Sequence, residues 1–218
     1  MEKLNAAQLL KEQNTTLSTP RRTYSWLARG LFFSMDLFYG RRATLKKFKV
    51  LEIIARVPYQ AWENVGYVAI THTFHRKDFP RRIFDRVKES RQQQDNEQWH
   101  LLILEEQLAR QGVRQGFIRF WLIPQIMAFV YYHLSWLLYA INPALSYRMN
   151  ADFEDHAEHE YMTFVQNNPD LAKLPFDSMF REDYGPFANM ADVYRQIGYD
   201  ERKHKEESLI RLSEPRYA

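Results

Sequence analysis

Four glutamates and two histidines in this chain recur with a spacing that suits metal binding. They are Glu52, Glu97-x-x-His100, Glu154 and Glu201-x-x-His204. Each lone glutamate precedes a Glu-x-x-His pair, by 45 residues in the first half and by 47 in the second. Residues three apart share one face of a helix, so each pair can direct a carboxylate and an imidazole at one point. Two such helical hairpins carry the ligand set of a di-iron or di-manganese carboxylate bundle, which makes a redox enzyme the leading hypothesis.

A less specific interpretation is that these residues are charges on the exposed faces of amphipathic helices. Glu-x-x-His pairs also arise by chance in a chain that is rich in glutamate. The context favours the metal site, because each pair lies in a long proline-free segment and follows a glutamate on another predicted helix. The alternative is a non-catalytic peripheral membrane scaffold, which would hold no stoichiometric metal.

The composition narrows the fold and the chemistry. Seven glycines in 218 residues, long helix-compatible segments and no strand-like alternation predict an all-α fold, a ferritin-like four-helix bundle. Cysteine is absent, which excludes disulfides, iron–sulfur clusters and thiol switches and leaves carboxylate and imidazole as the strong metal ligands. The net charge of +3 is too small to indicate a nucleic-acid partner, and we expect none.

The ligand candidates must be positioned by helices of one domain. We expect an N-terminal arm at residues 1–20, mobile or forming a short extra helix, a single metal-binding domain at 21–212 and a tail at 213–218. The helix that carries Glu52 is predicted over 46–76, with a kink at Pro58. Caps and prolines predict the other ligand helices at 78–112, 142–167 and 189–212.

Two apolar segments predict attachment to a membrane. Residues 24–39 are apolar on nearly every side but too short to span a bilayer, which suits a helix lying in the interface between basic flanks. Residues 117–141 are long enough to span, but several residues interrupt the run: Arg119, Pro124, Gln125, His133 and Ser135. We expect this helix to lie in one leaflet, so that attachment is monotopic, and a spanning helix is the alternative.

Four short stretches around the ligand candidates form a specific set of motifs. They are EIIARVPY at 52–59, NEQWHLLILEE at 96–106, EDHA at 154–157 followed by Tyr161, and DERKH at 200–204. In content and order they resemble the alternative oxidase family, and more narrowly its plastid terminal oxidase branch. The similarity covers about residues 43–212.

The resemblance implies that residues 21–212 form a di-iron quinol oxidase domain. It makes the six residues of the spacing pattern the ligands of two iron ions, and it places Asn96 and Asp200 behind the ligands, where they would orient them. It also implies that Tyr161 acts in oxygen reduction. Tyr161 follows Glu154 by seven residues, which is about two helical turns, and a buried structural tyrosine is the alternative.

The expected reaction is oxidation of a quinol, plastoquinol in preference to ubiquinol, and reduction of O2 to water without proton pumping. The resemblance further implies a lipid bilayer and a second copy of the chain as partners. The expected location is the cytoplasmic or stromal face of a thylakoid or cyanobacterial-type inner membrane. The polar first twenty residues, with Glu2 and Glu12, predict neither a signal peptide nor an Arg-rich transit peptide.

Two residues are candidates for contact with the quinol. Glu160 stands directly before Tyr161, where the family usually has Thr. The sequence therefore leaves undecided whether this position contacts the quinol. Arg56 could bind the head group or be a structural ion-pair partner. A di-iron quinone hydroxylase would use the same metal ligands and is the alternative enzyme.

Overall fold

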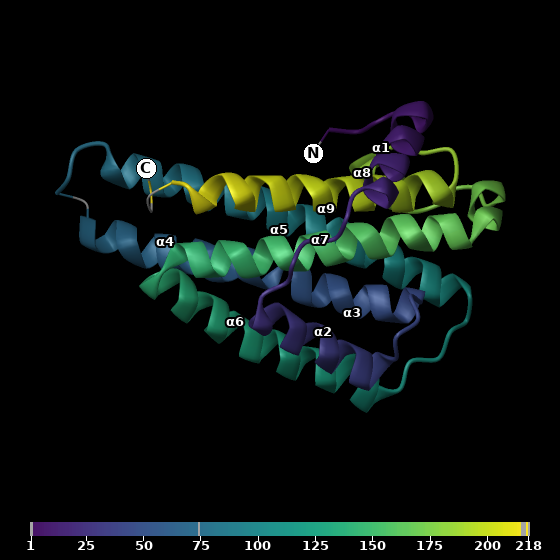
Figure 1. Ribbon diagram of the computed structural model, residues 1–218, viewed down its shortest axis with the longest axis horizontal. Helices are drawn as coiled ribbons and strands as arrows, with labels where there is room; N and C mark the ends of the chain where they lie inside the picture. Colours follow the sequence, from purple (N-terminus) through teal and green to yellow (C-terminus); the bar gives the residue numbers. More distant parts are fainter. Residues whose placement is uncertain (1, 74, 215–216, 218) are drawn as a thin grey trace.

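The computed structural model describes residues 2–73, 75–214 and 217. Helices joined by loops make up this part of the chain, and its one β-type pairing is an isolated bridge between Pro175 and Asn189 (Figure 1). The prediction of an all-α fold is confirmed. The helices in chain order are α1 (Ala6–Ser18), α2 (Trp26–Tyr39), α3 (Leu45–Ala55), α4 (Val57–Thr73), α5 (Phe79–Arg110), the π-helix η1 (Ile118–Leu122), α6 (Ile123–Ile141), α7 (Pro143–Asn167), the 3₁₀-helix η2 (Pro169–Lys173), α8 (Arg181–Tyr184) and α9 (Met190–Leu212). Parts of the predicted arm (residue 1), helix 46–76 (residue 74) and tail (residues 215, 216 and 218) lie outside the described residues.

Helices α3, α5, α7 and α9 form the bundle that carries the ligand candidates. In Figure 1 the two long helices α7 and α9 lie side by side, with α5 behind α9 and α3 close to α7. Gly198 on α9 allows a close approach, because a Cβ atom there would lie only 3.0 Å from the Cε atom of Met162 on α7. α7 and α9 are therefore closely packed one turn before Glu201.

The predicted helix 46–76 is two helices in the structure. α3 ends at Ala55 and α4 begins at Val57, with Arg56 between them, and α4 continues in a similar direction (Figure 1). Pro58 has no backbone N–H, so it cannot donate to the carbonyl of Ile54 one turn earlier. The Arg56 N–H turns to that carbonyl instead, and α3 ends at Ala55, three residues before the proline.

The predicted starts of the other ligand helices are confirmed. α5 has Pro80 in its first turn, and α7 begins at Pro143. The side chain of Asn142 accepts a hydrogen bond from the Ala144 N–H at 3.2 Å, and that of Asn189 accepts one from the Asp192 N–H at 3.0 Å. These caps satisfy backbone donors that have no partner within the helix.

The N-terminal arm contains a helix that packs on the bundle. α1 contacts α9 and α7, as Figure 1 shows. The Gln13 side chain donates to the Met162 carbonyl at 3.0 Å, and Arg202 donates to the Glu12 carbonyl at 2.8 Å. Of the two alternatives for residues 1–20, the short extra helix is the one observed.

The apolar segments form α2 and the pair η1–α6, which lie together along one side of the molecule (Figure 1). The Tyr39 hydroxyl at the end of α2 donates to the Arg119 carbonyl in η1 at 2.9 Å. Both helices expose large apolar side chains, among them Trp26, Phe33, Leu37, Trp121, Ile126, Phe129 and Ile141. No helix in the described part of the chain combines the length and the apolar character that a membrane crossing requires.

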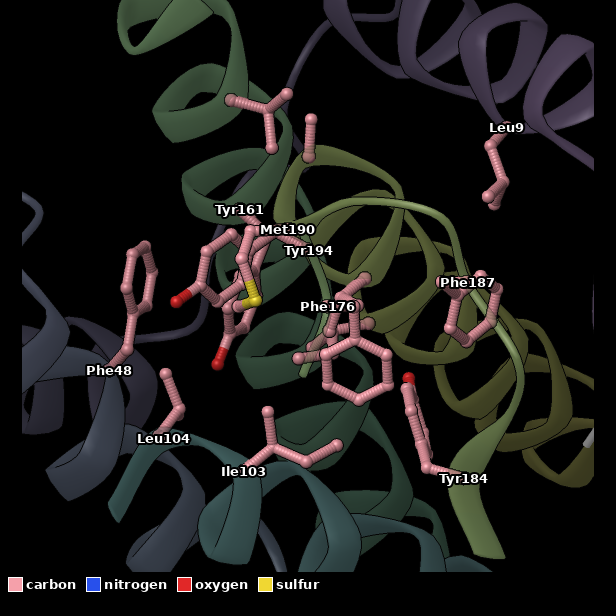
Figure 2. Packing of buried hydrophobic residues seen from close by; sticks show 14 residues of the cluster. Leu9, Phe48, Ile103, Leu104, Tyr161, Phe176, Tyr184, Phe187, Met190 and Tyr194 are labelled. Atoms are coloured by element: carbon pink, nitrogen blue, oxygen red, sulfur yellow. The ribbon is translucent and has the colours of Figure 1, made fainter. Parts of the chain in front are cut away.

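Three apolar clusters surround the middle of the bundle. The first contains Phe48, Tyr161 and Tyr194, and Figure 2 shows the ring of Phe48 facing that of Tyr161. These two rings stack with their centroids 4.2 Å apart. The second cluster joins α2, α3, α6 and α7, and the third packs around Tyr59 and Trp62. Together they keep water from most sides of the ligand candidates.

Candidate metal centre

The six residues of the spacing pattern meet inside the bundle. They come from α3 (Glu52), α5 (Glu97 and His100), α7 (Glu154) and α9 (Glu201 and His204), and all six are fully buried. They form two groups of four in which the ligand atoms lie within 4.8 Å of one another. One group is Glu52, Glu97, His100 and Glu201, and the other is Glu97, Glu154, Glu201 and His204. Because Glu97 and Glu201 belong to both groups, the arrangement can hold two adjacent cations bridged by these carboxylates.

The donor atoms of this centre lack hydrogen-bond partners among the described residues. Such buried atoms are both oxygens of Glu97 and Glu201, one oxygen each of Glu52 and Glu154, and Nδ1 of His100 and His204. An unpaired buried polar atom normally costs free energy. Ion pairs balance part of the charge here, such as that of His204 Nδ1 with Glu97 Oε1 at 2.6 Å, and the remaining lone pairs fit a cation-binding site. Carboxylate oxygens and imidazole nitrogens suit iron or manganese. The residues therefore fit a dinuclear centre of this kind.

The acid–base properties of the centre reflect the crowding of its charges. Burial, and then the charge of Glu201, raise the pKa values of Glu52 and Glu154 well above their usual range. Burial acts on Glu97 in the same direction, but the adjacent histidines outweigh it and hold the pKa of Glu97 below its usual range. Burial would lower the pKa of His204, but the neighbouring carboxylates raise it to about 10. These shifts all reflect the crowding of carboxylates and imidazoles in a buried space.

His100 is held from behind by a buried carboxylate. Its Nδ1 faces the centre, 3.2 Å from Glu201 Oε1, and its Nε2 lies 3.4 Å from Asp200 Oδ2. The Asn96 side chain and the Tyr184 hydroxyl donate to the same Asp200 oxygen, at 3.2 and 2.9 Å. This is the carboxylate–histidine arrangement that fixes the ring of a metal-binding histidine. Asp200 thus contacts His100 directly, and Asn96 contacts Asp200.

Two buried tyrosines contact the two glutamates that belong to only one group. The Tyr161 hydroxyl donates to Glu52 Oε1, and the Tyr59 hydroxyl donates to Glu154 Oε1, the latter at 2.6 Å. Burial, and then the adjacent glutamate, raise both phenol pKa values, so both groups are protonated donors at neutral pH. The contact of Tyr59 was not predicted from the sequence. The spacing could have indicated it, because Tyr59 follows Glu52 by seven residues, just as Tyr161 follows Glu154.

A third group of possible ligands, Asp155, Glu158 and His159, is an ion-pair network. These three residues also lie close together and are buried. Lys205 Nζ lies 3.1 Å from Asp155 Oδ1 and also pairs with Glu158, and Arg202 Nε lies 2.9 Å from Glu158 Oε1. Because two basic side chains already balance the carboxylates, this group needs no metal ion. It joins α7 to α9 and α1.

The two candidate quinol contacts lie apart from each other. Arg56, between α3 and α4, donates to Gln98 and, at 3.1 Å, to Gln94, and it lines a groove of about 300 Å³ beside α6. Glu160 on α7 pairs with Arg21 at 2.8 Å. The structure thus brings together the six ligand candidates, Asn96, Asp200 and Tyr161, but not Arg56 and Glu160.

Comparison with known proteins agrees with this geometry. Residues 2–209 match the family described as alternative oxidase. The chain belongs to the alternative oxidase family. Among its relatives, ubiquinol oxidase 4 of Arabidopsis thaliana, chloroplastic/chromoplastic, is 30% identical over 76% of this chain and 47% of that protein. The mitochondrial ubiquinol oxidase 1c of the same plant is 22% identical over 90% of this chain and 57% of that protein.

Membership of this family confirms the resemblance seen in the motifs, including its plastid branch, since the chloroplastic relative is the more similar of the two. The chain spans about half the length of the curated relatives it matches. Alternative oxidases are di-iron proteins, and the buried Glu and His groups of this chain are able to bind metal.

Replacing a shared glutamate should remove more iron than replacing an unshared one. Glu97→Gln keeps the shape of the side chain but removes a charge that both groups use, so we expect loss of about two irons per chain, whereas Glu154→Gln should lose about one. Iron analysis after anaerobic loading and desalting measures this. Glu63→Gln, on the partly exposed face of α4, is the control and should load fully. Full loading of Glu97→Gln would refute the shared-ligand assignment.

Proposed function

We propose that this chain is a membrane-associated quinol oxidase that oxidises plastoquinol in preference to ubiquinol and reduces O2 to water without pumping protons. Two quinols supply the four electrons and four protons that convert one O2 into two waters. The observation that carries the proposal is the pair of buried Glu and His groups that share Glu97 and Glu201. Membership of the alternative oxidase family supports it.

The proposed centre consists of two iron ions held by the six residues of the spacing pattern. When bound, iron supplies the redox chemistry, accepting electrons from quinol and donating them to O2. Four glutamates balance the charge of two divalent ions, which avoids an uncompensated charge in an apolar interior. Asp200 fixes the ring of His100, and Asn96 fixes Asp200.

Tyr161 is the proposed catalytic tyrosine. Its hydroxyl donates a hydrogen bond to Glu52, which is a ligand candidate, so the phenol lies next to the proposed metal centre. Its ring is fixed by stacking on Phe48, which leaves the O–H as the group free to take part in chemistry. We assign it the supply of a proton and an electron during oxygen reduction.

Quinol is proposed to reach the centre from the apolar side of the molecule. The exposed faces of α2 and α6 suit a donor that stays in lipid. Arg56 lies one turn after Glu52, in a groove that also contains Gln60 and Gln125, and its guanidinium can bind the oxygen of a quinol head group. Glu160, which pairs with Arg21, is a second candidate contact on the other side of α3.

The exposed aromatic and aliphatic side chains of α2, η1 and α6 support monotopic attachment to a bilayer. Basic residues at the ends of α2, such as Arg21 and Arg41, favour anionic lipid. By its similarity to the plastid branch we place the protein on the cytoplasmic or stromal face of a thylakoid or cyanobacterial-type inner membrane. A homodimer is part of this proposal, and sedimentation of the purified protein tests it.

Oxygen uptake by purified, iron-loaded protein tests the function. We expect quinol-dependent uptake, with a higher kcat/KM for a plastoquinol analogue than for a ubiquinol analogue of equal chain length. Arg56→Gln should raise KM more than it lowers kcat, because it removes a contact with the head group. Transfer of labelled oxygen from O2 into the quinone would instead indicate the hydroxylase, and absence of uptake by fully loaded protein would refute the oxidase.

Tyr161→Phe and Tyr59→Phe form a matched pair. Each removes a buried O–H that donates to a glutamate belonging to only one of the two ligand groups. We expect both variants to keep the fold and the iron. Tyr161→Phe should lose nearly all turnover, whereas Tyr59→Phe should keep a substantial part because only the position of Glu154 is affected. Equal losses of turnover would contradict a special role for Tyr161.

The absence of cysteine allows a clean test of membrane topology. Arg114→Cys and Arg148→Cys place one thiol before and one after η1 and α6, at exposed positions. In sealed vesicles that carry the protein on their outer face, an impermeant thiol reagent should label both variants. Labelling of one variant only would establish a spanning helix and refute monotopic attachment.

A further inference from the structure

A polar cleft of about 560 Å³ is lined by residues of α5, α8 and α9 and by Lys3. In Figure 1, α5 and α9 lie on the side of the molecule away from α2 and α6. Its floor contains Gln93, Asn96 and Tyr184, all of them buried. Tyr184 and Trp99, at the edge of the first apolar cluster, form one part of its lining. The rest consists of charged and amide side chains, mostly of α5 and α9. We call this feature the polar cleft.

Residues that line the polar cleft contact the carboxylate behind the metal centre. Asn96 and Tyr184 both donate to Asp200 Oδ2, which lies 3.4 Å from Nε2 of His100. Asn96 also directly precedes Glu97 on α5. The Gln93 side chain donates to Glu207, which lies one turn after His204 on α9. The cleft therefore borders the polar residues that contact or adjoin the ligand candidates.

Asn96 presents an unsatisfied acceptor in this floor. It is 6% exposed, and its Oδ1 has no hydrogen-bond partner among the described residues, while its Nδ2 donates to Asp200. A buried carbonyl oxygen without a donor is unfavourable unless water or a cation visits it. Amide oxygen is an acceptable ligand for divalent ions that keep part of their water shell.

The charges around the cleft would attract cations. Its lining includes four carboxylates, Glu89, Asp95, Asp183 and Glu207, and two basic side chains, Lys3 and Arg211. Arg211 pairs with Glu89 at 2.8 Å, and the carboxylates still outnumber the basic side chains. An excess of acidic groups in a concave site attracts cations. A hydrated divalent ion would cross the apolar clusters only at a large cost in desolvation.

We propose that the polar cleft is the route by which Fe²⁺ reaches the metal centre from water, with Asn96 Oδ1 as a transient ligand beside Glu97. The inference rests on the proposed metal centre, but not on the reaction that the centre performs. Quinol and iron then approach from different sides, quinol through the apolar helices and iron between α5 and α9.

Blocking the cleft with a removable label tests the route. Gln92→Cys places a thiol at its exposed lip, and Gln166→Cys on α7 places one outside it. Because the natural chain has no cysteine, a bulky methanethiosulfonate modifies each variant at one site. Stopped-flow mixing of metal-free protein with Fe²⁺ under anaerobic conditions should show uptake about tenfold slower or more after labelling of Gln92→Cys, because access becomes limiting. Reductive removal of the label should restore the rate, and labelled Gln166→Cys should match wild type.

Removal of charge from the lip is an independent test. The double variant Asp95→Asn, Asp183→Asn should slow Fe²⁺ uptake about two- to tenfold at low ionic strength and less at high salt, with the final iron content unchanged. Asp170→Asn, at an exposed position on η2, is the control. Equal uptake rates in labelled Gln92→Cys and wild type would overturn the route alone. Metal-free wild type that takes up no iron would overturn the metal centre itself.

Discussion

The structure depends on one electrostatic constraint, which is that four carboxylates are placed together in an interior without water. Glu52, Glu97, Glu154 and Glu201 are all fully buried, and much of their hydrogen-bonding capacity is unused. Such a cluster is stable only when protons or cations balance it. Burial and the charge of Glu201 raise the pKa values of Glu52 and Glu154, and the neighbouring carboxylates raise that of His204 against the effect of burial. The centre is therefore built for cations, whatever reaction they perform.

The same constraint explains the crosswise arrangement of the two tyrosines. Glu52 and Glu154, which each belong to only one ligand group, offer one oxygen to the centre and accept a hydrogen bond from a tyrosine with the other. Tyr161 of α7 donates to Glu52 of α3, and Tyr59 of α4 donates to Glu154 of α7. A phenol donor reduces the charge on a carboxylate without neutralising it. It also joins neighbouring helices through the site, so that the separation of the ligands depends on bundle packing as well as on helix geometry.

Local signals in the sequence were enough to predict the ligand helices and the convergence of their Glu and His residues. A cap such as Asn142 or Asn189 and a Glu-x-x-His spacing act within one helix, so no knowledge of packing is needed. The contact of Tyr59 with Glu154 was missed because it depends on how α4 is rotated against α7. The break at Arg56 was missed because a proline can bend a helix or divide it, and tertiary contacts decide which occurs. The docking of α1 and the polar cleft between α5 and α9 likewise depend on contacts between distant parts of the chain.

The distribution of polarity around the centre gives the molecule two chemically different sides. The helices that cover the α3 and α7 side carry exposed aromatic and aliphatic groups, whereas α5 and α9 enclose charged and amide side chains. A substrate dissolved in lipid and an ion dissolved in water cannot share a path, because each would lose its favourable solvation on the path of the other. The proposed centre uses both, so it needs two approaches, and the buried amides of Gln93 and Asn96 line the polar one. Asn96 connects this lining to the centre, because it donates to Asp200, which lies beside His100. In this proposal the sparse contact between α5 and α9 gives the ion its approach, while the extensive contact between α7 and α9 holds the ligands in place.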